Sequence, residues 1–264
     1  MIVDYHMHLR APDESIDHNV EAAERFVDQA SERGIDEIGF TEHVYYFEQT
    51  RHLWSMPYHL ERCVYDIEPY VDAVVEAKRR GHPVKLGIEV DYEPGREDET
   101  AEALAPYPWD YVLGSIHFLD GLGIDADPSL VGSVGPEAAW RRYYETLGSA
   151  ARSGLFDSLA HPDLVKFHGD EIEWDWDAVA GTLDGVAVEV SSAGLHKPHG
   201  KLYPNQGLLQ AARARSIPIT LASDAHVPQN VGRDLDRAVE HARAAGYETV
   251  TVFDRRRSRQ EPLG

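Results

Sequence analysis

Residues 2–9 read I-V-D-Y-H-M-H-L and place two histidines, His6 and His8, at the end of a short apolar run. A run of this length and composition predicts a buried strand. Residues two apart on a strand point to the same face, so both imidazoles can reach a single metal ion. A lone pair of strand histidines is more often packed or solvated than bound to metal. Other residues in the sequence are therefore needed to distinguish a metal site from ordinary packing.

Apolar runs and amphipathic stretches alternate along the chain. Strands are predicted at residues 2–9, 37–43, 84–92, 111–119, 158–163, 186–192 and 217–226, with one more at 249–254. Helices are predicted at residues 19–33, 68–80, 136–153, 206–215 and 235–245, and three of them end next to Gly34, Gly81 or Gly154. A strand followed by a helix, repeated about seven times, predicts parallel strands with crossover helices.

Two α/β architectures fit this alternation, a barrel and an open doubly wound sheet. No G-x-G-x-x-G or P-loop follows any strand, which excludes the usual nucleotide sites. Nearly every predicted strand instead ends in a histidine or a carboxylate. A barrel gathers all its strand ends around one mouth, whereas an open sheet spreads them along a line. The pattern therefore favours one α/β domain over residues 1–264, built as a TIM-like barrel.

The strand ends carry side chains that bind metal ions through nitrogen or oxygen. Beyond the first strand these are His43 in T-E-H, Glu89 and Asp91 in E-V-D, His117 in G-S-I-H, His161 in A-H-P-D, Glu189 in V-E-V, and Asp224 and His226 in S-D-A-H. Each has an ordinary explanation by itself, such as a helix cap or a satisfied interior histidine. Together they predict a metal site for Zn, Mn or Fe. Their number exceeds the four ligands of one zinc, so two or three divalent ions with a bridging carboxylate are expected.

Composition narrows the partners. The chain has 46 acidic and 25 basic residues, a net charge of −21, which disfavours binding of a nucleic acid polymer. No apolar run is long enough for a membrane helix, and no signal peptide is visible. A single cysteine, Cys63, fits a reducing cytoplasm and is interpreted as packing. His52, His59, His82 and His241 are expected on the surface, and the sequence does not indicate an oligomeric state.

The order of H-x-H, T-E-H, G-x-E-x-D, G-S-I-H, A-H-P-D and S-D-A-H, from Asp4 to His226, resembles the PHP (polymerase and histidinol phosphatase) superfamily. Three stretches are similar to its histidinol-phosphate phosphatase branch: G-S-I-H-F, A-H-P-D-L-V-K-F and E-V-S-S-A-G-L-H-K-P-H-G-K-L-Y-P. The resemblance implies a distorted (β/α)7 barrel with a trinuclear metal centre at the strand C-termini. It also implies hydrolysis of L-histidinol phosphate to L-histidinol and phosphate, a step of histidine biosynthesis.

The resemblance further implies how the ligands divide among the ions. His6, His8, Glu89 and Asp224 would hold one ion, Glu89 would bridge to a second ion on His117 and His161, and His43 and His226 would hold a third. The third ion needs a ligand from the loop after the first strand, where the family has a shorter C-P-H-G pattern. Here the loop reads R-A-P-D-E-S-I-D-H-N, so His18 is the first choice, Asp17 the fallback and Asp13 a further alternative.

A second departure concerns the phosphate. The family loop G-L-R-K-P uses its arginine for phosphate, but residues 194–198 read G-L-H-K-P and put His196 at that position. Lys197, Lys166 and Ser192 are the other candidates for substrate contact. By resemblance, a metal-bridging hydroxide attacks phosphorus, no protein nucleophile is needed, and Asp224 and His226 could handle protons. Two alternatives stay open, a PHP phosphoesterase acting on nucleotides or another small ester, and a metal-binding module without catalysis.

Overall fold

The computed structural model describes residues 1–264 except 12, 14, 126–133 and 169–173, and its centre consists of short parallel strands. They form two sheets, with strand orders β1-β2-β3 and β10-β9-β8-β5-β4. Their bounds are β1 Val3–Asp4, β2 Glu37–Phe40, β3 Val84–Leu86, β4 Glu89–Asp91, β5 Leu113–Ser115, β8 Ser158–Leu159, β9 Ala187–Ser191 and β10 Ile219–Ala222. The α/β class with parallel strands is confirmed.

Backbone contacts join the two sheets at both ends. Next to β1, the Tyr5 amide donates to the Leu221 carbonyl at 2.9 Å, and Met7 forms an isolated parallel bridge with Ala225. Next to β2, Gly87 N donates to Phe40 O at 2.8 Å, and the bridge from His43 to Glu89 continues this pairing. With β3 and β4 taken as one interrupted strand, the ring runs β1-β2-β4-β5-β8-β9-β10. The expected barrel is thus present in distorted form, closed by single bridges rather than by full ladders.

The interruption between β3 and β4 corrects the prediction of one strand over residues 84–92, and Gly87 lies at this point. A Cβ atom at Gly87 would lie 2.6 Å from the Cζ of Tyr111, which is too close for any side chain. Tyr111 crosses the interior of the ring and donates its hydroxyl to the Tyr5 carbonyl at 2.6 Å. The bulk of this ring inside a narrow barrel leaves room only for glycine at this point.

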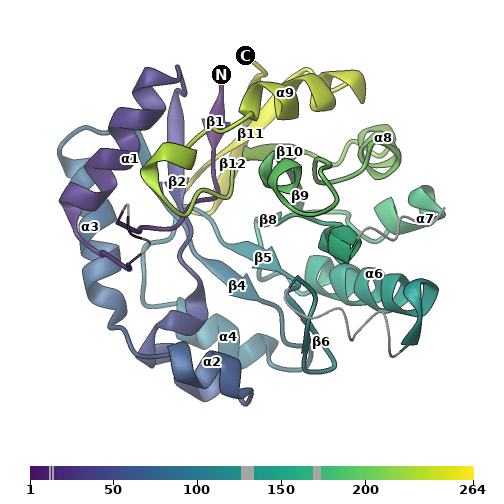
Figure 1. Ribbon diagram of the computed structural model, residues 1–264, viewed down its shortest axis with the longest axis horizontal. Helices are drawn as coiled ribbons and strands as arrows, with labels where there is room; N and C mark the ends of the chain where they lie inside the picture. The colour runs from purple at the N-terminus through teal and green to yellow at the C-terminus, as the bar shows by residue number, and fades with distance from the viewer. Residues whose placement is uncertain (12, 14, 126–133, 169–173) are drawn as a thin grey trace.

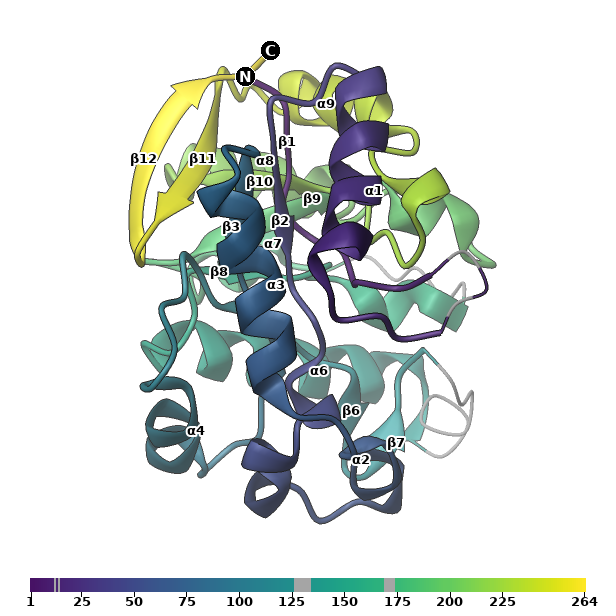
Figure 2. The ribbon, with the colours of Figure 1, turned by 90° about the vertical axis from the view of Figure 1, so that its left-hand side faces the viewer.

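Two further strand predictions need adjustment. The stretch 111–119 contributes only β5 to the ring, because β6 (Phe118–Leu119) turns back on β7 (Leu122–Gly123) as an antiparallel hairpin. Asp120 and Gly121 between them both have positive φ, as a two-residue D-G hairpin turn requires. The strand at 249–254 exists as β11 (Thr249–Asp254). It pairs antiparallel with β12 (Arg257–Pro262) in a hairpin at one side of the molecule (Figure 2).

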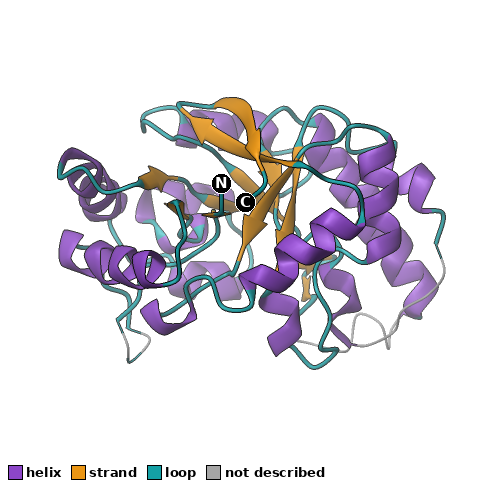
Figure 3. Ribbon diagram, turned by 90° about the horizontal axis from the view of Figure 1, so that it is seen from above, coloured by secondary structure: helices purple, strands orange, loops and turns teal. Residues whose placement is uncertain are grey.

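Helices surround the strands (Figures 1 and 3). The five predicted helices are α1 Val20–Glu32, α3 Ile67–Arg79, α6 Pro136–Arg152, α8 Gln206–Ala214 and α9 Leu235–Ala244, and the shorter ones are α2 Pro57–Arg62, α4 Glu97–Leu104 and α7 Trp176–Ala180. Capping explains where α1 starts, because the Asn19 side chain accepts from the Ala22 amide at 2.8 Å. Within the described residues, no helix is long and apolar enough to cross a membrane.

Candidate metal centre

His6 and His8 follow β1 and are fully buried at the C-terminal ends of the strands, with their side chains facing the same space. The Nε2 atom of each lies 3.6 Å from Asp224 Oδ1. Glu89 Oε2 lies 3.4 Å from His6 Nε2 and 3.7 Å from His8 Nε2. Side chains from three different segments, the ends of β1 and β10 and the start of β4, therefore meet at separations longer than ordinary hydrogen bonds.

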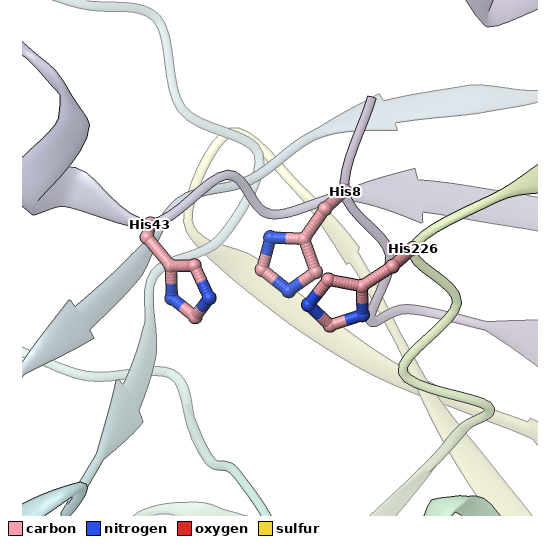
Figure 4. Close-up of side chains that lie close together, drawn as sticks. All are labelled: His8, His43 and His226. Atoms are coloured by element: carbon pink, nitrogen blue, oxygen red, sulfur yellow. The ribbon is translucent and has the colours of Figure 1, made fainter. Parts of the chain in front are cut away.

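Eight of the predicted ligands fall into overlapping groups of donor atoms, and all atoms of a group lie within 4.8 Å of one another. In the described part of the chain the groups are His8–His43–His226, His6–Glu89–His161, His6–His8–Asp224 and His43–Glu89–His117. Figure 4 shows the first group, whose imidazole rings lie side by side although they come from three separate segments. Because half of these residues belong to two groups, the arrangement suits more than one ion.

The donor set also fits divalent metal ions chemically. His6 Nε2, His8 Nε2 and both carboxylate oxygens of Glu89 are buried without a hydrogen-bond partner among the described residues. Burying a carboxylate and imidazoles in this way is costly unless a cation is shared between them. Nitrogen and oxygen donors without thiolate suit Zn, Mn or Fe. The geometry groups His117 with His43, and His161 with His6, which differs from the pairing implied by the resemblance.

Two carboxylates contact the Nδ1 atoms of cluster histidines and thereby orient their imidazole rings. Glu189 Oε2 accepts from His6 Nδ1 at 2.8 Å, and Asp91 Oδ1 lies 2.5 Å from His117 Nδ1. A carboxylate on Nδ1 fixes the tautomer that leaves Nε2 free to bind an ion. Glu189 and Asp91 are both among the carboxylates predicted at strand ends, and the structure places them where they orient histidines.

Glu42 was missed by the sequence reasoning. Its carboxylate is fully buried, 3.6 Å from His8 Nδ1 on one side and 3.6 Å from His18 Nε2 on the other. Alternation along a strand turns Glu42 away from the face of His43, so the T-E-H motif drew attention to the histidine alone. The signal that could have found it is an acidic residue in an otherwise apolar strand.

Electrostatics in the cluster favour cations. Burial opposes the charge of His117, but Asp91 and Glu89 outweigh it and raise the pKa of His117 to about 10. Burial likewise opposes the charge of Glu89, yet His6, His43 and His117 hold the pKa of Glu89 well below its usual range. His117 thus keeps a proton that a metal ion has to displace, whereas burial lowers the pKa of His226 to about 3 and leaves that ring neutral.

A pocket of about 720 Å³ opens onto the cluster. His43, His117 and His226 supply metal-type nitrogens to its lining. The remaining walls combine aromatic side chains with charges of both signs, namely Tyr45, Tyr46, Tyr58, Phe118, Arg10, Lys197 and Asp125. A cavity with aromatic walls and a few polar groups is typical of a small-molecule site.

The predicted phosphate ligands lie in different surroundings. Lys197 lines this pocket. Lys166 is 1% exposed and donates to Asp163 Oδ2 at 2.8 Å and to the Leu202 carbonyl at 2.5 Å, so its charge is already used. Ser192 is buried and donates to the Arg233 carbonyl at 2.6 Å. These contacts disfavour a substrate role for Lys166 and Ser192.

His196 lies outside the 720 Å³ pocket. Its Nε2 is 2.7 Å from Asp234 Oδ2, and its Nδ1 contacts the Arg233 guanidinium. With Lys197, Asp224 and His226 it borders a smaller hollow of about 160 Å³. The structure therefore places His196 beside the cluster but between two charged partners of its own.

The loop after β1 offers three predicted ligands. His18 is the one closest to the cluster, and its Nε2 faces Glu42 Oε1 at 3.6 Å. It belongs to none of the four donor groups among the described residues. Asp17 pairs with Arg25 at 2.9 Å, and Asp13 is exposed and accepts from Ser15 Oγ at 2.7 Å. The geometry thus keeps the preference for His18 over the two aspartates.

The expectation that His59 lies on the surface is wrong. His59 is fully buried, and its Nε2 lies 3.2 Å from Asp91 Oδ2, on the side of that carboxylate away from His117. His59 therefore helps to fix the position of the Asp91 carboxylate, which in turn orients the imidazole of His117. Sequence spacing gave no indication of this, because His59 lies on the short helix α2, far along the chain from Asp91.

The family model of the PHP domain matches residues 4–193, more than half of the chain. The chain belongs to the PHP family. The match begins at Asp4, includes His6 and His8, and extends beyond β9, so it contains most of the donor cluster but not Asp224 and His226.

Curated relatives and a solved structure of this family can be aligned over most of the chain. A protein named "Probable histidinol-phosphatase" from Deinococcus radiodurans is 39% identical over 183 residues, which cover 66% of this chain and 69% of the relative. The histidinol-phosphatase of Bacillus subtilis is 27% identical and covers 79% of this chain and 88% of its own length. The histidinol phosphate phosphatase of Lactococcus lactis, solved with zinc, L-histidinol and phosphate, superposes with a TM-score of 0.74 at 19% identity and covers 98% of both chains. This likeness shows the same distorted barrel fold.

Proposed function

We infer that this protein is a metal-dependent phosphomonoester hydrolase whose substrate is L-histidinol phosphate. The observation that carries the inference is the buried cluster of imidazole and carboxylate metal-ligand atoms that borders a 720 Å³ pocket. The name of the Deinococcus relative, 39% identical to this chain, supports the substrate.

The residues that would hold the ions are the eight of the donor groups, with His18 as a further ligand. Divalent ions bound there would lower the pKa of a water molecule and neutralise charge on the phosphate oxygens. Hydrolysis breaks the bond between phosphorus and the ester oxygen, forms a bond from a water oxygen to phosphorus, and gives a proton to the leaving oxygen. His226 and Asp224 belong to the donor groups themselves, and burial lowers the pKa of His226 to about 3, so the proton for the leaving oxygen would come from water in the pocket.

The pocket wall matches the organic part of this substrate. Histidinol carries a flat imidazole and an ammonium group. Tyr58 and Phe118, with ring centroids 5.1 Å apart, offer aromatic surface for the ring, and Asp125 offers a carboxylate for the ammonium. With the phosphate toward the donor cluster, both groups of the substrate meet chemistry that suits them.

A panel of phosphate esters tests this proposal. Zinc- or manganese-loaded protein is assayed for phosphate release from L-histidinol phosphate, a nucleoside monophosphate, glycerol phosphate and p-nitrophenyl phosphate. We expect kcat/KM to favour L-histidinol phosphate by about 100-fold or more, because the pocket offers paired contacts to both polar ends. A preference for the nucleotide would support the alternative PHP phosphoesterase. No phosphate release from any ester with any metal would support a non-catalytic metal-binding module.

A further inference from the structure

Arg10 is a largely buried cation at the pocket wall. Its side chain is 8% exposed, and Nη2 donates to the Tyr46 hydroxyl at 2.6 Å. The guanidinium carbon lies 5.1 Å from the centroid of the Tyr46 ring. Within the described part of the chain, no carboxylate forms an ion pair with it. Lys166, the other strongly buried cation, has Asp163 at 2.8 Å.

The position of Arg10 connects it to the pocket. It lies two residues after His8 and lines the same cavity as His43, His117 and His226. A guanidinium has five N–H donors in a rigid plane, and Tyr46 takes one of them. Free donors of Arg10 are therefore available at the wall beside the donor cluster.

Burial opposes the charge of Arg10, and the Glu42 carboxylate raises the pKa of Arg10 without forming a direct ion pair. An anion bound beside the guanidinium lowers the remaining cost of burial. The protein carries a net charge of −21, so anions are not attracted by its surface as a whole. A local cation is needed to hold one. Lys197 is the other cation that lines this pocket, but its ammonium is a point charge on a flexible stem. Arg10 is held in place by the Tyr46 hydroxyl and ring, and its planar fork matches two phosphate oxygens at once.

We propose that Arg10 binds the phosphoryl group of the substrate and orients it against the donor cluster. This proposal rests on the proposed function as a phosphate-ester hydrolase, but it does not depend on which ester is the natural one. It assigns to a residue in the loop after β1 the role that sequence reasoning sought in Lys166 and His196. Both of those side chains are occupied by carboxylates, Asp163 and Asp234.

The test measures inorganic phosphate with zinc-loaded protein, by calorimetry and as an inhibitor of p-nitrophenyl phosphate hydrolysis. Arg10→Gln should bind phosphate about 30-fold more weakly or worse, with zinc content unchanged. Arg10→Lys should keep part of the affinity and lose about 10-fold, because it retains the charge without the fork. Arg62→Gln is the matched control, since Arg62 stacks on the ring of Tyr58, 3.7 Å from its centroid, but does not line the pocket.

A role in packing alone would lower the unfolding temperature and leave phosphate affinity unchanged, and that result would overturn the proposal. If either variant loses zinc, crystals of the zinc-loaded wild type soaked in phosphate decide the question. Phosphate within hydrogen-bond distance of the Arg10 guanidinium supports the proposal, and phosphate held without it overturns it. If the wild type does not hydrolyse L-histidinol phosphate while phosphate binding still depends on Arg10, the proposed substrate is wrong and the proposed role of Arg10 is retained.

Discussion

Glu189→Gln is a nearly isosteric change that tests how the cluster is oriented. Glu189 lies on β9 and is fully buried. Its Oε2 accepts from His6 Nδ1 at 2.8 Å, and its Oε1 accepts from the His161 amide at 3.1 Å. A carboxylate can accept both bonds, whereas a carboxamide offers one acceptor and one donor. The variant must therefore lose one of the two contacts.

Either loss has a defined consequence. If the amide nitrogen faces His6, Nδ1 must accept, the proton moves to Nε2, and His6 can no longer bind an ion. If the amide nitrogen faces His161, the His161 N–H is left unpaired, which costs about 1–3 kcal/mol of folding stability. Loss of an orienting partner typically weakens metal affinity by about 10–100-fold, or about 1.4–2.7 kcal/mol.

Competition with a chelator of known zinc affinity at pH 7, together with urea unfolding, measures both effects. Glu240→Gln is the control, because Glu240 is an exposed residue on α9. Zinc affinity and stability that both stay at the wild-type values in Glu189→Gln would refute the reasoning that Glu189 fixes the tautomer of His6.

Two further outcomes follow from the site and the fold. Zinc binding at pH 7 should release protons, because the pKa of His117 near 10 in metal-free protein means that a proton must leave before Nε2 can bind. Affinity should accordingly fall as pH is lowered, and calorimetry in buffers of different ionisation enthalpy measures the release; a heat that is independent of buffer would contradict it. Gly87→Ala should lower the free energy of unfolding by about 1–3 kcal/mol, because its Cβ would lie 2.6 Å from Tyr111 Cζ. A stability equal to wild type in urea unfolding would show that Tyr111 can move.

The sequence predicted well those features that local chemistry determines. Helix α1 begins at a capping Asn19 and ends before Gly34, which has φ +68, so both boundaries were readable. The donor residues were readable because His6 and Asp224 repeat one pattern, a metal-type side chain where an apolar strand ends. The D-G turn at Asp120 carried a hairpin signal that the strand prediction passed over.

Other features depend on residues far apart in the chain. Glu42 and His59 act through His8 and Asp91, and no spacing along the sequence predicts those contacts. Lys166 also donates to the Leu202 carbonyl, 36 residues along the chain, and this contact cannot be predicted from sequence spacing. The Arg10 side chain is likewise held by the Tyr46 hydroxyl, 36 residues along the chain, and sequence periodicity cannot predict this contact.

The measurement that tests the central claim most directly compares Glu89→Gln with the wild type in two readouts, bound metal per chain and phosphate release from L-histidinol phosphate. Glu89 belongs to two donor groups, and its buried carboxylate lies among the imidazoles of the cluster, 2.8 Å from His43 Nδ1. We predict that the variant holds less metal and loses activity by about 100-fold or more, while it stays folded. A folded variant with full metal content and the wild-type rate would contradict the claim that this cluster is the catalytic metal centre.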